Sequence, residues 1–212
     1  MVKKSFLAVL ALSTALVFAV TPGHAGTDKK SDAKADGKEC PMMSPETMKL
    51  MAPGDAHKTL EAFAGKWNYT VQHRMAPDAP AMEMKGKTVN RMIMGNRFLQ
   101  QEAKGQAMKG QKMPAFEGMG LTGYDNVRKE YTTTWVDNMN TGMMTSTAQF
   151  DAAKNALTEK GTFSCPMTGK RNMNFRSVWT LVDKNKYTYE MFTKDEKGKE
   201  FKAMEIAYTR TK

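Results

Sequence analysis

Short runs of alternating apolar and polar residues fill most of the chain after residue 65. Successive side chains of a strand point to opposite faces of a sheet, so this alternation predicts strands with one buried face. Turn-forming pairs such as Gly95-Asn96 and Asp125-Asn126 separate the runs. The pattern predicts about ten strands, at residues 66–73, 84–94, 97–104, 118–124, 130–137, 145–150, 156–163, 173–182, 186–193 and 200–211.

About ten consecutive short strands with almost no helix between them are typical of an up-and-down antiparallel β-barrel. Closure removes the exposed edges that so many strands would otherwise present, and a barrel of this size has room for a small ligand. One short helix is predicted before the first strand, with Asp55 as its N-cap and Gly65 as the turn that ends it. We therefore expect an all-β, up-and-down barrel over residues 53–212.

The start of the first predicted strand, Gly65-Lys66-Trp67, is similar to the Gly-x-Trp opening of lipocalin-like folds. Those folds place a cation across the Trp ring, and Arg210 lies in the last predicted strand. We expect a cation–π contact between Trp67 and Arg210, worth about 0.5–2 kcal/mol. The alternative is that Trp67 is an ordinary core aromatic and Arg210 a surface charge.

Residues 1–25 have the composition of a secretory signal peptide: basic residues, a short apolar run, and small residues at Gly23 and Ala25. The run is too short for a permanent anchor, and no transmembrane span is expected after cleavage. Residues 26–52 are predicted to be flexible, first rich in Lys and Asp and then in Met, with order beginning near Cys40 or Pro53. We expect an exported protein, in the periplasm or outside the cell.

The formal net charge is +10, from 32 basic and 22 acidic residues. The basic residues are scattered along the chain, which indicates a solvated surface and argues against a nucleic-acid partner. The glycines of residues 118–123 match the dinucleotide fingerprint, but a predicted strand follows them where that fingerprint requires a helix. The chain shows no nucleophile–base pattern either, so we expect a binding protein rather than an enzyme.

Cysteine and methionine suggest two different chemistries. In an oxidising compartment Cys40 and Cys165 most simply form a disulfide. Both precede Pro-Met, and soft sulfur ligands suit copper(I). A copper site is therefore an alternative interpretation, although no cofactor is required by the rest of the sequence. The copper ligands would be Cys40, Met42, Met43, Cys165 and Met167. Alternatively, the 20 methionines are ordinary side chains that fill gaps in the core.

Several segments together resemble one bacterial family, the domain of unknown function numbered 1579. They are His57-Lys58-x-Leu60, Gly95-Asn96-Arg97-Phe98-Leu99, Gly123-Tyr124-Asp125-Asn126, Trp135-x-Asp137-Asn138-Met139, Thr168-Gly169-Lys170 and Met204-Glu205-Ile206-x-Tyr208. The resemblance implies a calycin-like barrel and no established activity. Members usually carry Asp-Pro where this chain has Cys165-Pro166-Met167, so copper chemistry is not implied by the family.

Our leading hypothesis is a non-enzymatic protein that binds a small apolar or amphipathic molecule inside the barrel. Arg97 or Arg176 would anchor an anionic group, whereas the motifs around Tyr124 and Asp137 have turn formation as an alternative role. A pocket enzyme is the third reading and requires inward carboxylates with perturbed pKa values. The predicted ligand-binding residues are Trp67, Arg97, Tyr124, Tyr131, Trp135, Asp137, Arg176 and Glu205.

Overall fold

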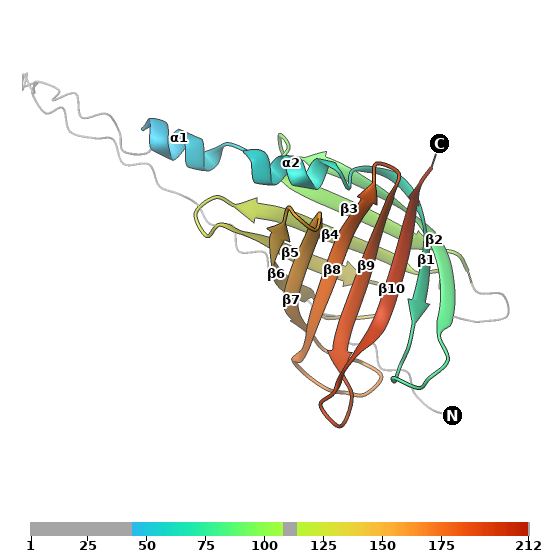
Figure 1. Cartoon of the computed structure of the whole chain (residues 1–212). Helices are drawn as coiled ribbons and strands as arrows, with labels where there is room; N and C mark the ends of the chain where they lie inside the picture. Colours follow the sequence, from blue (N-terminus) through green and yellow to red (C-terminus); the bar gives the residue numbers. More distant parts are fainter. Residues whose placement is uncertain (1–43, 108–113, 212) are drawn as a thin grey trace, which may run out of the picture. The chain divides into compact units, whose positions relative to one another are not determined.

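The computed structural model describes residues 44–107 and 114–211. Within them, ten antiparallel strands form a closed barrel in which sequence neighbours pair and the first strand pairs with the last (Figure 1). Two short helices, α1 (Pro45–Met51) and α2 (Asp55–Glu61), precede the barrel. The strands are β1 (Gly65–His73), β2 (Met82–Ile93), β3 (Phe98–Gly105), β4 (Glu117–Asp125), β5 (Glu130–Asp137), β6 (Met144–Asp151), β7 (Ala156–Phe163), β8 (Met173–Asp183), β9 (Lys186–Lys194) and β10 (Glu200–Arg210).

The predicted fold class is confirmed, and each predicted strand agrees with an observed one to within two residues at either end. The sequence analysis assigned no helix to the segment that contains α1. Ser44 caps this helix by accepting a hydrogen bond from the Thr47 N–H at 3.2 Å, and Pro45 occupies its first turn. None of the residues of α1 is buried, so its sequence carries little apolar pattern.

The barrel closes where β1 pairs with β10, in a register that sets Trp67 opposite Arg210. The Arg210 guanidinium carbon lies 4.0 Å from the centre of the Trp67 ring, which is the cation–π contact that the sequence predicts. Arg210 also donates hydrogen bonds to the carbonyls of Ala64 and Lys184, each at 2.8 Å. These contacts tie the end of the chain to the turn between α2 and β1.

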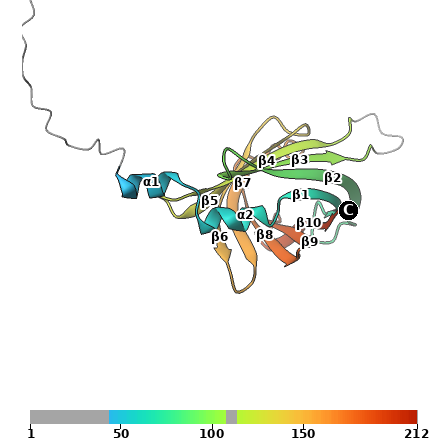
Figure 2. The ribbon, with the colours of Figure 1, turned by 90° about the horizontal axis from the view of Figure 1, so that it is seen from above.

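Helix α2 lies over one end of the barrel (Figure 2). Its apolar side and the following turn contribute Leu60 and Phe63, each 1% exposed, to the main core cluster. Trp67 is equally buried, and its Nε1–H donates to the Phe63 carbonyl at 3.0 Å. The Phe63 ring also packs edge-on against Tyr187. Large side chains therefore fill the barrel at the α2 end.

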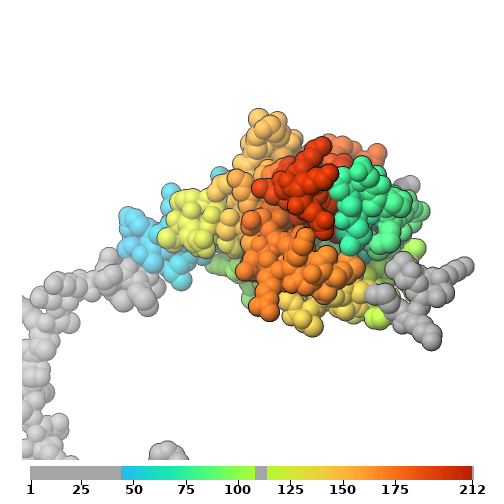
Figure 3. Space-filling view, turned by 90° about the horizontal axis from the view of Figure 1, so that it is seen from below, coloured from blue at the N-terminus to red at the C-terminus, as the bar shows by residue number. Residues whose placement is uncertain are grey.

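At the other end the connections β1–β2, β7–β8 and β9–β10 surround the barrel (Figure 3). Side chains on the inner faces here are less covered than those beside α2. Trp135, Met204 and Ile206 are only half-buried, although they pack against the second core cluster around Tyr69 and Val71. Within the described ranges, no helix has the length and apolar character needed to cross a membrane.

Candidate functional site

A set of polar side chains is buried inside the barrel, between the two core clusters. Alternation along each strand places them on the inner face: on β7, for example, Leu157 and Glu159 are buried while Lys160 is exposed. Buried polar groups need hydrogen-bond partners. The strand residues of this set are Thr88, Asn90, Gln101, Thr122, Ser146, Glu159 and Ser177.

Glu159 is the only carboxyl residue among the buried side chains of residues 44–107 and 114–211, with 3% of its surface exposed. The register places it between Ala148 on β6 and Ser177 on β8. The Ser177 hydroxyl donates to one carboxylate oxygen, and the Ser146 hydroxyl donates to the other at 3.4 Å. Neither of these partners carries a positive charge, and the hydrogen bonds of the Glu159 side chain are to hydroxyl groups.

Two buried polar atoms of the described part have no hydrogen-bond partner: Gln101 Oε1 and Trp179 Nε1. Gln101 is 3% exposed and Trp179 is 8% exposed. Their strands, β3 and β8, are five positions apart in the closed ring, so the two side chains lie on opposite walls. Each unpaired group costs about 1–3 kcal/mol relative to a paired one.

Tyrosines surround Trp179 on the inner wall. Tyr189 lies opposite it in the β8–β9 register and packs edge-on against it, with ring centres 5.1 Å apart. Tyr187 stacks on Tyr208 at 4.0 Å. Burial raises the pKa of Tyr208 and of Tyr189, and the nearby Glu159 charge raises the pKa of Tyr189 further. Both phenols therefore stay neutral at physiological pH, and both remain half-buried.

Of the predicted ligand-binding residues, Trp67, Tyr131 and Trp135 lie on the inner wall. The polar atoms of Trp67 and Tyr131 form hydrogen bonds within the protein. Trp67 Nε1–H donates to the Phe63 carbonyl, and the Tyr131 hydroxyl donates to the Ala56 carbonyl at 2.9 Å. Trp135 Nε1 donates to Asp137 Oδ2 at 3.0 Å. Asp137 also accepts from the Met139 N–H, which gives it the turn role that the sequence left open.

Arg176 and Glu205 lie on the outer face, where they cannot line the interior. Arg176 alternates with the buried Phe175 and Ser177, and it forms an ion pair with Glu200 at 2.8 Å. Glu205 pairs in register with Gln72 and forms an ion pair with Lys202. Strand alternation is the physical reason in both cases.

Arg97 lies outside the interior too, in a recess of about 190 Å³ between the end of α1 and two hairpin turns. Tyr124 borders the same recess, but it lies on the inner face of β4 and packs against Tyr131 and the main core cluster. Arg97 donates to the Met51 carbonyl at 2.9 Å. Asn126 donates to the carbonyls of Leu50 and Ala52. Arg97 and Asn126 thus hold the chain between α1 and α2.

Gly54, and not Asp55 as the sequence predicts, is the N-cap of α2, and the side chain of His57 completes the cap. The backbone N–H of Gly54, the N-cap, donates to His57 Nδ1 at 3.0 Å. Asp55 is instead the first residue of α2 and forms an exposed ion pair with Lys58. Gly65 does not end α2 as predicted, because the helix stops at Glu61 with Ala62 as its C-cap. Gly65 is the first residue of β1, and its φ of 130° lies in the region that favours glycine.

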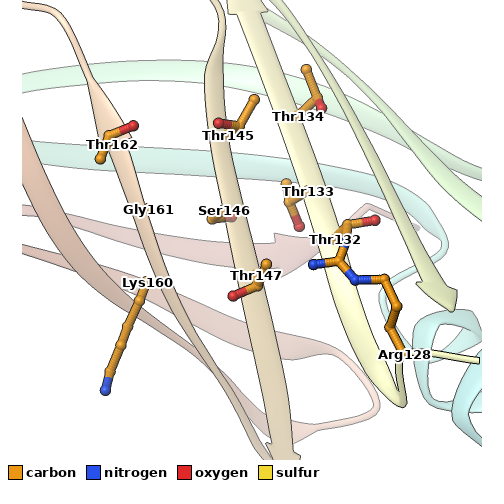
Figure 4. A pocket seen from close by; sticks show the side chains of 10 residues that line it. All are labelled: Arg128, Thr132, Thr133, Thr134, Thr145, Ser146, Thr147, Lys160, Gly161 and Thr162. Atoms are coloured by element: carbon orange, nitrogen blue, oxygen red, sulfur yellow. The ribbon is translucent and has the colours of Figure 1, made fainter. Parts of the chain in front are cut away.

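A larger groove of about 380 Å³ lies on the outer surface of β5, β6 and β7 (Figure 4). Threonines of neighbouring strands face one another across it, as in the row Thr134, Thr145 and Thr162. Arg128 and Lys160 stand at its margin, and Arg128 is already paired with Glu130. The groove is open and hydroxyl-lined.

The predicted disulfide and copper site fall partly outside the described residues, which exclude Cys40, Met42 and Met43. Both therefore stay predictions. Cys165 is half-buried in the β7–β8 connection, and a hydrogen bond with the Thr168 side chain is the main cause that lowers the pKa of its thiol. Met167 beside it is exposed.

Sequence reasoning missed the residues that now define the interior: Gln101, Glu159, Ser177 and Trp179. The alternation of residues 157–163 does carry a signal, because Glu159 shares a face with Leu157 and Phe163. A carboxylate that shares a strand face with large apolar side chains is expected to point inward, which favours Glu159 over Glu205 as an interior residue.

Comparison with known proteins gives a family and a fold. The family described as "Protein of unknown function (DUF1579)" matches residues 52–210. No curated protein matches the chain. The crystal structure of Rv2717c from M. tuberculosis is similar with a TM-score of 0.56 at 13% identity, covering 76% of this chain and 100% of that one. A redesigned β-barrel has a TM-score of 0.39 at 13% identity, covering 73% and 96%.

Proposed function

The chain belongs to the DUF1579 family, and we propose that it is an exported, non-enzymatic protein that binds a small apolar or amphipathic molecule inside its barrel. The family has no stated function, so the proposal depends on this chain's own interior. Aromatic and methionine side chains line most of that interior and suit an apolar ligand body.

The observation that carries the proposal is the pair of unpartnered polar atoms on opposite walls, Gln101 Oε1 and Trp179 Nε1. A ligand with both hydrogen-bond donors and acceptors would satisfy them and recover the free energy that their burial costs. Entry is supported from the end away from α2, where inner side chains such as Trp135 and Met204 remain half-buried.

Binding of N-phenyl-1-naphthylamine, a neutral apolar dye whose emission rises in apolar surroundings, tests the proposal. Ala103 is buried against the second core cluster, and its neighbour Lys104 is exposed on the outer face. We expect Ala103→Phe, which fills the interior, to weaken dye binding by about tenfold or more. Lys104→Phe should leave it unchanged, and both variants should keep the β-sheet circular dichroism spectrum.

Native mass spectrometry of protein purified from its own envelope supplies a test that needs no variant. A co-purified small molecule that leaves on denaturation supports the proposal. Absence of both dye binding and a co-purified molecule in the folded protein would overturn it, as would equal weakening by the two substitutions.

A further inference from the structure

We propose that the interior selects an organic cation, an ammonium group carried on an apolar body, and rejects anionic amphiphiles. This inference rests on the proposed function, and it names the class of ligand. It follows from the charge and the aromatic surroundings of one part of the inner wall, around Glu159 on β7, Ser177 and Trp179 on β8, and Tyr189 on β9.

Among the described residues, Glu159 has no buried cation beside it. Within residues 44–107 and 114–211, Glu159 is the only buried acidic residue, and no Lys or Arg is buried. The basic residues next to this wall, Lys160 and Arg176, alternate with inward positions and lie on the outer face. A carboxylate held only by Ser146 and Ser177 hydroxyls lacks the opposite charge that buried carboxylates generally have.

Aromatic side chains lie near Glu159 on the inner wall. Ser177 is its register partner, and Trp179 lies two residues further along the same face of β8, opposite Tyr189. The faces of Trp and Tyr rings attract cations, and several such rings together recognise alkylated ammonium groups. Burial raises the pKa of Tyr189, so its ring is neutral, and the residue is only half-buried.

The same wall disfavours an anionic ligand. A fatty-acid carboxylate placed at this wall would meet the Glu159 charge in surroundings of low dielectric constant, where like charges repel strongly. Arg97 and Arg176, the cations that the sequence offered as anion anchors, both lie outside the interior. The unpartnered Trp179 Nε1–H still requires an acceptor, which a hydroxyl or carbonyl on the ligand body would provide.

The experiment compares three chains of equal length as competitors of bound N-phenyl-1-naphthylamine: decyltrimethylammonium, decanol and decanoate. We expect the ammonium compound to displace the dye at a concentration at least about tenfold below that of decanoate, with decanol between them. Glu159→Gln should reduce the ratio of ammonium to decanoate affinity to about threefold or less.

Glu190→Gln is the matched control, because Glu190 lies on the outer face of β9 in an ion pair with Lys202. It should keep the full preference. Equal displacement by the three competitors, or a preference for decanoate, in the unmodified protein overturns the inference and leaves the proposed function intact. Failure of the dye to bind the folded protein, together with the absence of a co-purified molecule, overturns the proposed function itself. The order of the competitors decides the matter even where Glu159→Gln does not fold.

Discussion

Gly65 occupies a position where both backbone conformation and space demand glycine. Its φ of 130° lies in a region that other residues rarely adopt. A Cβ at this position would overlap the Arg210 guanidinium that covers Trp67. The contact between the first and last strands of the barrel therefore depends on a residue with no side chain.

We predict that Gly65→Ala lowers the free energy of unfolding by about 1–3 kcal/mol, because it adds backbone strain and displaces Arg210 from Trp67. Gly142→Ala is the control, since a Cβ there meets nothing within 4 Å and its φ is not positive. It should change stability by no more than about 0.5 kcal/mol. Urea denaturation followed by tryptophan fluorescence measures both, and equal stability of the two variants would contradict the account.

Among the elements, α1 is held to the barrel by hydrogen bonds rather than by burial. None of its residues is buried, and the contacts at its C-terminal end are those of Asn126 and Arg97 with carbonyl oxygens. Few buried apolar contacts mean that this element opens locally at little cost in free energy.

Asn126→Ala is therefore expected to raise amide hydrogen exchange across residues 44–53 while the barrel strands keep their protection. Asn68→Ala, on the exposed side of β1, serves as the control and should leave both regions unchanged. Exchange measured by mass spectrometry at peptide level resolves the two regions. Faster exchange of the strands as well would show that Asn126 supports the barrel itself.

Strands were predictable here because their signals are local. Alternation of apolar residues and turn pairs such as Gly95-Asn96 set the ends of each strand, and Asn96 indeed has positive φ. Helix α1 escaped prediction because it presents no buried face, and Ser44 followed by Pro45 was its only signal. The inward or outward direction of Glu159, Arg176 and Glu205 was also readable from alternation. The unpaired atoms of Gln101 and Trp179 were not, since they depend on packing across the whole barrel.

For the molecule as a whole, two histidines, the buried His57 and the half-buried His73, link stability to pH. Burial is the main cause that lowers the pKa of His57 and of His73 below the ordinary value of about 6.5. Below about pH 6.5, the two histidines bind protons more readily in the unfolded chain than in the folded protein. Stability is therefore fully present above about pH 6.5 and declines as the pH falls from there toward the folded-state pKa values.

We predict that the free energy of unfolding falls between pH 7.5 and pH 5.5, and that His57→Asn loses less over this interval than the unmodified protein. Asn can still accept the Gly54 N–H bond but does not titrate here. Carboxylates with a lowered pKa, such as Asp125, change the free energy of unfolding only below about pH 3.9, their ordinary pKa. They therefore do not contribute between pH 7.5 and pH 5.5. Urea denaturation curves at the two pH values provide the measurement, and identical losses in both proteins would contradict the assignment to His57.

The pairing of β1 with β10 has a consequence for how the protein is made. During synthesis the N-terminal strand emerges first, and its partner on one side is the last strand to leave the ribosome. Until then the nascent sheet has two open edges that can associate with other chains. Contacts between residues so distant in sequence also form slowly. A holding chaperone that shields these edges would therefore raise the yield of folded protein more than one that accelerates local strand formation.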